Sequence, residues 1–167
     1  MITVLLTHGY IGFGKTTVAK KFESLGYIRF THDEYMVKLF GDHPENEEFR
    51  NNYHFATEVI LKEAKEQIKN NNNVILDFGF WSRSSRKWIY NLLKSWEKDL
   101  NVIIHVVWLN IQCDIETARQ RCIDRDNNRK SGELWVPITV FDGKLHKFEP
   151  MNEYPNEFQD SQLIIKN

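Results

Sequence analysis

Cysteine, long apolar runs and an excess of charge of either sign are all scarce in this 167-residue sequence. Its two cysteines, Cys113 and Cys122, form no C-x-x-C pair and lie near no histidine cluster at zinc-ligand spacing. Apolar runs such as Val102 to Leu109 are much too short to span a bilayer, and no basic segment precedes an apolar signal core. We therefore expect a cytoplasmic protein with reduced thiols and no membrane association.

The charges nearly cancel, with 22 basic against 23 acidic residues, so the net charge does not favour binding of nucleic acid. A local basic groove is still compatible with this composition. The 41% hydrophobic and 13% aromatic content indicates a packed core. The length suits one domain over residues 1–167, either monomeric or dimeric. No repeat or linker interrupts it, and the four asparagines at 70–73 are typical of a helix-ending loop.

Strand-like and helical patterns alternate along the chain. The first helical pattern carries Val18, Phe22 and Leu25 on one face, and the last begins after Pro137 and carries apolar residues as far as Phe148. This alternation predicts a parallel α/β sheet. Its five expected strands are residues 1–7, 27–31, 74–77, 102–109 and 163–165.

A glycine-rich turn after the first expected strand matches G-x-x-x-x-G-K-[ST]. Backbone N–H groups of such a loop turn toward phosphates, and the following helix adds its positive end. Lys15 would contact the β- and γ-phosphates of ATP, and the Thr16 hydroxyl would bind Mg²⁺. The predicted ATP-binding residues are Gly9, Gly12, Phe13, Gly14, Lys15, Thr16 and Thr17.

The alternative is a glycine-rich turn that binds no nucleotide, which the flanking strand and helix make improbable. Phe13 is bulky for its place beside the last glycine. Its ring must either point away from the phosphates or pack on the nucleotide, and the sequence leaves both open.

Two acidic residues follow expected strands, where the ligands of open α/β sheets bind. Asp33 is the predicted general base for a hydroxyl acceptor, with capping of a helix over 34–40 as its alternative. Asp77 is predicted to bind the acceptor, and its alternative is a carboxylate that caps the turn into Gly79. Either aspartate could also hold metal-bound water beside Thr16.

Aromatic and arginine-rich segments complete the expected site. Trp81 and Arg83 are predicted to line the acceptor pocket, and Arg83 is favoured over Arg86. Arg121 and Arg125 lie one helical turn apart beside a polar segment, which is typical of a lid over about 119–136 that supplies charge to the transferring phosphoryl group. A solvated helix face is the alternative for this pair.

Taken together, these motifs resemble the P-loop kinases of the zeta-toxin, chloramphenicol phosphotransferase and polynucleotide kinase group. The likeness covers nearly the whole chain and includes Asp33 to Met36, Asp77 to Trp81 and Phe148-Glu149-Pro150. It implies a three-layer fold like that of nucleoside monophosphate kinases, with strand order 2-3-1-4-5. It also implies Asp33 as general base and Arg121 and Arg125 as lid residues.

The acceptor is less defined than the reaction. Polynucleotide kinases usually carry an arginine for the acceptor phosphate where Met36 stands here, so nucleic acid is not favoured. We expect ATP- and Mg²⁺-dependent transfer of the γ-phosphoryl group to a hydroxyl of a small molecule. The alternatives are a polynucleotide or nucleotide 5′-kinase and a nucleotide-binding switch or ATPase that phosphorylates nothing.

Overall fold

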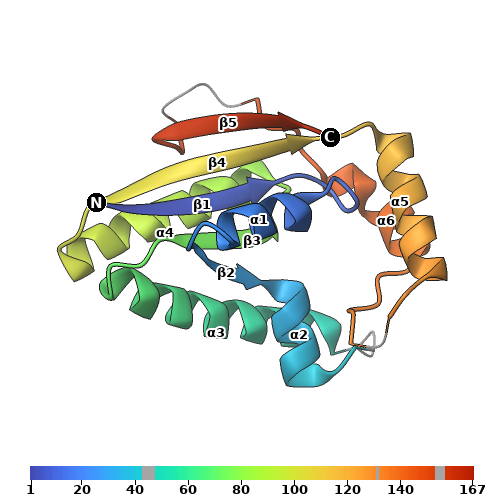
Figure 1. The fold of residues 1–167 in the computed structure, drawn as a ribbon, viewed down its shortest axis with the longest axis horizontal. Coiled ribbons are helices and arrows are strands. Elements are labelled where there is room, and N and C mark those ends of the chain that lie inside the picture. Colours follow the sequence, from blue (N-terminus) through green and yellow to red (C-terminus); the bar gives the residue numbers. More distant parts are fainter. Residues whose placement is uncertain (43–47, 131, 153–156) are drawn as a thin grey trace.

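The computed structural model describes residues 1–42, 48–130, 132–152 and 157–167 (Figure 1). Its strands are β1 (Ile2–His8), β2 (Ile28–Thr31), β3 (Val74–Gly79), β4 (Ile104–Gln112) and β5 (Ser161–Lys166). Its α-helices are α1 (Lys15–Glu23), α2 (His32–Phe40), α3 (Phe49–Lys69), α4 (Arg83–Leu100), α5 (Ile115–Asn127) and α6 (Ile138–Lys144). A short 3₁₀ helix, η1, covers Leu145–Lys147.

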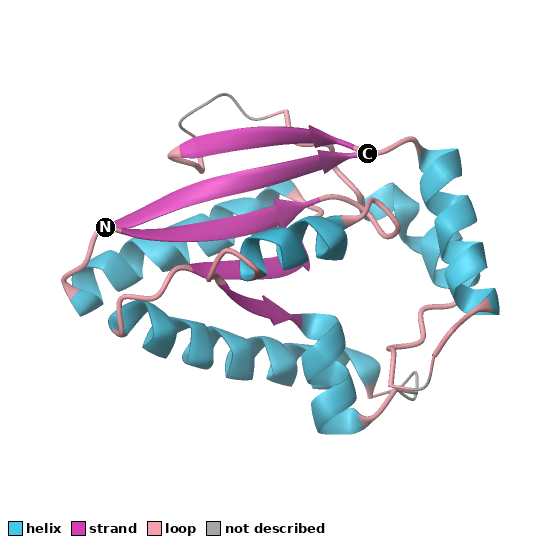
Figure 2. Cartoon of the chain, in the orientation of Figure 1, coloured by secondary structure: helices cyan, strands magenta, loops and turns pink. Residues whose placement is uncertain are grey.

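The five strands form one sheet in the order β2-β3-β1-β4-β5, and every neighbouring pair is parallel. This confirms the predicted α/β class and strand order. Figure 2 shows all five strands pointing toward the side where α5 and α6 lie. The residues that follow β1, β2 and β3 therefore meet along one edge of the sheet, as ligand-binding residues of such sheets do.

Alternating side chains along the strands build two cores. Val4 and Leu6 of β1 pack with α3 and α4 on one face, whereas Leu5 points to the other face, toward α1, α5 and α6. Both faces of a parallel sheet are buried in this way, which explains the nearly continuous apolar runs of its inner strands. The result is the expected arrangement of helices, sheet and helices.

Three local expectations need correction. Helix α1 ends at Glu23, so Leu25 lies beyond it and is 74% exposed instead of joining the apolar face. Helix α6 ends at Lys144 and continues only as η1, so Phe148 lies outside a helix. Strand β3 extends two residues past Asp77 to Gly79, because the backbone of Gly79 pairs with the end of β1.

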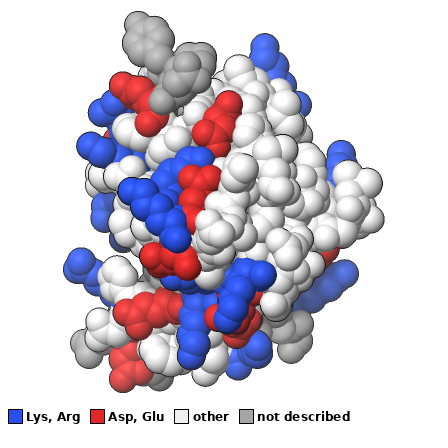
Figure 3. All heavy atoms as spheres, turned by 90° about the vertical axis from the view of Figure 1, so that its left-hand side faces the viewer, with Lys and Arg blue, Asp and Glu red and all other residues white. Residues whose placement is uncertain are grey.

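The amino ends of the strands form the face opposite the sheet edge just described. Figure 3 shows basic and acidic side chains interspersed on that face beside a broad uncharged area. The mixture of signs is in keeping with the balanced composition. Among the described helices, none is long and apolar enough to cross a membrane.

Candidate active site

The glycine-rich loop joins β1 to α1. Gly12 and Gly14 have φ values of 77° and 90°, which L side chains rarely adopt. A Cβ atom on Gly12 would lie 2.4 Å from the carbonyl oxygen of Ala118, and one on Gly14 would lie 2.6 Å from Asn167 Nδ2. The positive φ favours glycine at both positions, and at Gly12 the close packing of the loop on the α5 backbone also leaves no room for a side chain.

Phe13 points into the protein. Its side chain is 4% exposed and packs edge-on against Phe148, with the ring centroids 5.4 Å apart, and it also meets Tyr10. Of the two orientations left open by the sequence, the ring has the one that faces the core. Its backbone remains in the loop, where the Asn167 side-chain amide donates a hydrogen bond of 2.7 Å to the Phe13 carbonyl.

Lys15 is the first residue of α1, and its ammonium folds back over the loop. Its Nζ donates a hydrogen bond of 2.8 Å to the Tyr10 carbonyl oxygen. Burial lowers the pKa of Lys15, while the negative charges of Asp77 and Asp33 act in the opposite direction. The ammonium thus lies within the electrostatic reach of both predicted carboxylates.

Asp77 contacts the second residue of α1. The Thr16 hydroxyl donates to Asp77 Oδ2 at 2.9 Å, and the Thr7 hydroxyl donates to Oδ1 at 3.3 Å. The Asp77 side chain is 1% exposed, and this burial raises its pKa against the opposing effects of Lys15 and the Thr16 hydrogen bond. The structure thus directs Asp77 toward the phosphate loop and not into the turn before Gly79.

Asp33 lies in the first turn of α2. The helix begins at His32 with Thr31 as its N-cap, so the capping alternative for Asp33 is wrong. Solvent reaches its side chain, yet the surrounding protein raises the pKa of this carboxyl, with Asp77 acting in the same direction and Lys15 and Arg125 against it. The charge of Lys15 therefore acts on Asp33 as it does on Asp77.

The two arginines predicted for the lid lie on the phosphate-loop side of α5. Arg121 Nη1 donates to the Gly12 carbonyl oxygen at 3.4 Å, and the charge of Arg125 acts on both Lys15 and Asp33. Arg119, by contrast, makes a two-pronged ion pair with Asp142 of α6. The pair predicted from the spacing therefore faces the site, while the neighbouring arginine is bound to another helix.

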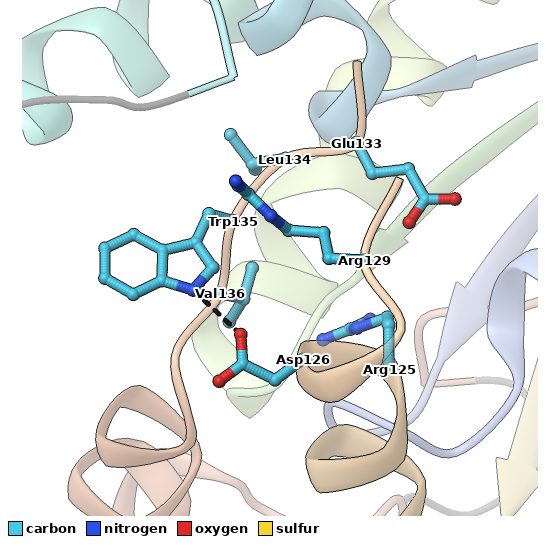
Figure 4. A pocket seen from close by; sticks show the side chains of 7 residues that line it. All are labelled: Arg125, Asp126, Arg129, Glu133, Leu134, Trp135 and Val136. Carbon is cyan, nitrogen blue, oxygen red and sulfur yellow. Dashed lines mark hydrogen bonds between the residues drawn. The ribbon is translucent and has the colours of Figure 1, made fainter. Parts of the chain in front are cut away.

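Residues 132–136 return past the end of α5 and meet the region after α2. The Gly132 amide donates to Asp42 Oδ2 at 3.2 Å, and the Trp135 indole donates to Asp126 Oδ1 at 2.8 Å. Figure 4 shows the hollow between this segment and the end of α5, with Arg125 on the helix, Arg129 on the chain that follows it and the Trp135 indole opposite. The hollow is lined by Arg125, Asp126, Arg129, Glu133, Leu134, Trp135 and Val136.

Trp81 and Arg83, the two predicted pocket residues, have separate surroundings. Trp81 is half-buried against Tyr10, with the ring centroids 4.8 Å apart, and a Cβ atom on Gly79 would lie 3.0 Å from its Nε1 and 3.3 Å from Lys15 Cε. Arg83 donates to Glu157 at 2.6 Å and lies over the Phe158 ring, and the structure does not bring it to Lys15. A carboxylate and an aromatic face from the segment before β5 hold the guanidinium there.

The Phe148-Glu149-Pro150 segment supports the start of α4. Its Glu149 amide donates to the Trp81 carbonyl at 2.9 Å, and the Glu149 carboxylate accepts from the Arg83 amide at 2.8 Å. Buried Arg86 donates to the carbonyls of Phe80, Trp81 and Glu149. Arg86 is therefore a structural residue that holds the chain following β3.

Sequence reasoning missed three residues beside the site. The Tyr10 carbonyl oxygen accepts the hydrogen bond from Lys15, and the buried Tyr10 hydroxyl donates to the Phe141 carbonyl oxygen at 2.6 Å. Tyr53 of α3 stacks on His32 and lies within the electrostatic reach of Asp33, and burial raises the pKa of its phenol. Arg29 of β2 forms an ion pair with Asp77. Only Arg29 carried a signal, as a charged residue inside an apolar strand.

The oxygen groups present suit a hard cation held mainly by phosphate. The described residues contain no group of three or more His, Cys, Asp or Glu side chains able to hold a metal by themselves. The adjacent Thr16 hydroxyl and Asp77 carboxylate are nevertheless the ligand types that Mg²⁺ takes beside a nucleotide. A metal bound together with phosphates therefore fits this corner.

The strand order, the glycine-rich loop after β1 and Lys15 at the start of α1 together define a P-loop protein with a kinase-type fold. The pattern of the family described as AAA domain matches residues 4–151, so the chain belongs to that family. A comparison with curated proteins yields no match.

Solved kinase structures share the fold at low sequence identity. A candidate kinase from Chloroflexus aurantiacus J-10-fl has a TM-score of 0.72 at 11% identity, covering 99% of this chain and 88% of its own. A fungal RNA kinase has a TM-score of 0.65 at 14% identity, with 99% and 75% covered. A chain of the Pnkp1/Rnl/Hen1 RNA repair complex has a TM-score of 0.62 at 18% identity over 87% of this chain, which spans only 43% of that relative.

Proposed function

We propose that the protein is an ATP-dependent kinase that transfers the γ-phosphoryl group to a hydroxyl of a small molecule. The observation that carries this proposal is that Asp77 accepts a hydrogen bond from Thr16 of the phosphate loop, while Lys15, Asp33 and Arg125 lie within electrostatic reach of one another beside it. Each of these groups acts on the charge of another, although they come from four different elements. A loop that only bound nucleotide would not need a second carboxylate on α2.

The residues divide the work of phosphoryl transfer. The loop amides and Lys15 bind the β- and γ-phosphates, and Arg121 and Arg125 neutralise charge on the transferring group. The Thr16 hydroxyl and Asp77 hold Mg²⁺, directly or through water, and the metal supplies further charge neutralisation when bound. Trp81, whose indole lies beside Gly79 and Lys15, lines the acceptor side of the site.

Asp33 acts as the general base. Its carboxylate is open to solvent, lies within the electrostatic reach of Lys15 and has no hydrogen-bond partner among the described residues, so it is available to an acceptor hydroxyl. Its raised pKa brings the base closer to neutrality, where proton transfer is more effective. Because the base must be ionised, the transfer rate falls as the pH is lowered through this raised pKa.

The replacement Asp33→Asn tests the assignment. We expect the turnover number with a phosphorylated acceptor to fall by roughly 10²- to 10⁴-fold, because the amide accepts no proton. ATP affinity, measured by calorimetry, should stay within a few-fold of the wild type. Asp99→Asn, at an exposed carboxylate of α4, is the matched control and should leave both quantities unchanged. Normal turnover by Asp33→Asn would exclude the base assignment.

A screen of candidate acceptor molecules would identify the substrate. Coupled ADP release with ATP and magnesium would be measured against nucleosides, sugars, aminoglycosides, phenicols and 5′-hydroxyl oligonucleotides. A small-molecule acceptor that raises ADP release well above the basal rate supports the proposal. ADP release that no acceptor increases would favour a nucleotide switch or an ATPase instead.

A polynucleotide 5′-kinase is the second candidate, because RNA kinase structures are among those that share the fold. Met36 weighs against it, since its side chain is fully buried and offers no charge to an acceptor phosphate. Labelling of a 5′-hydroxyl oligonucleotide decides between the candidates. Transfer to the oligonucleotide at a rate above that for nucleosides would favour the second.

A further inference from the structure

The indole of Trp81 presents a hydrogen-bond donor beside the phosphate loop. A Cβ atom on Gly79 would lie 3.0 Å from Trp81 Nε1 and 3.3 Å from Lys15 Cε. The same point lies 3.3 Å from the Gly9 carbonyl oxygen. The indole nitrogen and the lysine stem therefore border one position, which the absence of a side chain at Gly79 keeps free. The indole nitrogen carries a hydrogen and has no acceptor lone pair, so it can only donate.

This indole N–H differs from those of two other tryptophans. Trp108 donates to the Phe158 carbonyl oxygen at 2.7 Å, and Trp135 donates to Asp126 at 2.8 Å. No described residue accepts a hydrogen bond from Trp81 Nε1, which solvent reaches. Because the N–H of a largely enclosed tryptophan usually finds a partner, an oxygen of a bound ligand is the partner that this position would receive.

The turn that carries Trp81 has a rare backbone conformation. Phe80 has a φ of 42°, in the left-handed region that bulky residues seldom adopt. Its ring is 6% exposed and packs edge-on against Trp108, and Arg86 donates to the Phe80 and Trp81 carbonyls at 3.2 and 3.1 Å. Strained backbone persists where its surroundings fix it, and it clusters at functional sites. Here the fixed turn holds the Trp81 ring against Tyr10, with its nitrogen toward the loop.

We propose that the Trp81 indole N–H binds an oxygen of the γ-phosphoryl group of ATP. This inference rests on the proposed function, in which Lys15 binds the β- and γ-phosphates. The Lys15 ammonium has three hydrogens and donates one of them to the Tyr10 carbonyl. Since each N–H···O bond spans about 2.9 Å, one phosphoryl group reaches both the indole nitrogen and the ammonium.

The same contact acts while the phosphoryl group moves. The acceptor oxygen forms a bond to the γ-phosphorus as the bond from that phosphorus to the bridging oxygen breaks. The electron pair of the broken bond remains on ADP, and the acceptor proton passes to Asp33. The charge of the transferring group is spread over its three outer oxygens, and a donor fixed beside one of them stabilises it. Trp81 thus adds a neutral donor to the cationic Lys15, Arg121 and Arg125.

The test compares ADP with the non-hydrolysable ATP analogue AMP-PNP, each with magnesium, by calorimetry. Trp81→Phe keeps an aromatic ring and removes the N–H. We expect it to lower the affinity for AMP-PNP about tenfold, as for the loss of a hydrogen bond to a charged group, and to leave the ADP affinity unchanged. A merely structural role would lower both affinities alike. Trp88→Phe, at an exposed tryptophan of α4, is the matched control and should leave both unchanged.

A second measurement uses the wild-type protein and so does not depend on the folding of a variant. The chain has five tryptophans, and each gives one indole N–H signal in a proton–nitrogen NMR correlation spectrum. The Trp81 signal is identified by its proximity to the Tyr10 ring, whose centroid lies 4.8 Å from that of Trp81. We expect this signal to move downfield with AMP-PNP and to stay near its free position with ADP.

Two results would overturn the inference and leave the proposed function standing. One is a Trp81 signal that moves equally with ADP and AMP-PNP or with neither, although both nucleotides bind. The other is an AMP-PNP affinity that Trp81→Phe leaves unchanged or lowers no more than the ADP affinity. A wild-type protein that binds neither nucleotide would instead overturn the proposed function, and this inference with it.

Discussion

Two glycines of this chain differ sharply in how they tolerate a side chain. Gly12 has positive φ, and a Cβ there would meet the Ala118 carbonyl at 2.4 Å and Cys122 Sγ at 3.0 Å. Gly143 lies inside α6 with nothing within 4 Å of the Cβ position. The contrast separates a glycine that the loop geometry requires from one that merely occupies a helix.

Gly12→Ala should therefore damage both folding and binding. We expect the free energy of unfolding in urea to fall by about 2–4 kcal/mol, from left-handed strain and the clash with α5. Nucleotide affinity should fall with it, because the loop amides move. Gly143→Ala should stabilise by about 0.5–1 kcal/mol, as expected for alanine in a helix. Equal stability of the two variants would contradict this reading of the loop.

At the scale of elements, His8 joins the end of β1 to the segment after η1. Its ring stacks on Phe148 with centroids 5.2 Å apart, and Nδ1 lies 3.1 Å from the Phe80 carbonyl oxygen. Burial, together with the charge of Arg86, lowers the pKa of His8 to about 4. The neutral ring must carry its proton on Nδ1 to donate to Phe80.

This lowered pKa predicts acid sensitivity. The unfolded chain binds a proton near pH 6.5 and the folded chain only near pH 4, so stability present above 6.5 is lost as the pH falls through this window. We expect His8 to account for about 3 kcal/mol of the loss between pH 7 and pH 4. His8→Asn keeps a donor near Nδ1, and its urea unfolding should show a correspondingly flatter pH profile.

Exposed His146 provides the control for that profile. His146→Asn should reproduce the wild-type dependence on pH. Burial also lowers the pKa of His32, to about 3. His32 therefore adds a similar loss of stability on acidification, which both variants retain. An unchanged slope in His8→Asn would show that other groups carry the acid sensitivity.

For the whole molecule, nucleotide binding should appear as added stability. A ligand at about one hundred times its Kd stabilises the folded state by about 2.7 kcal/mol. For a chain of 167 residues this corresponds to a rise in Tm of about 5–10 °C. Thermal unfolding with and without ATP and magnesium measures it, and Lys15→Ala should abolish most of the rise. A rise that survives this replacement would place the nucleotide elsewhere.

The alternation of strands and helices, the loop from Gly9 to Thr17 and the arginine pair on α5 were all readable from the sequence. These features depend on local properties, namely the period of apolar residues, the φ preference of glycine and the spacing along a helix. The predicted α/β class and sheet order are confirmed, and the family match agrees with them.

Only the tertiary structure decided which side chains meet. It turned Phe13 into the core, joined Asp77 to Thr16, held Arg83 on Glu157 and brought Arg29 close to Asp77. Each of these contacts joins residues far apart in the chain. The sequence by itself determined the elements and the nucleotide loop, because those are set within a few residues. The partners of each charged group depended on how distant segments pack, which no local pattern encodes.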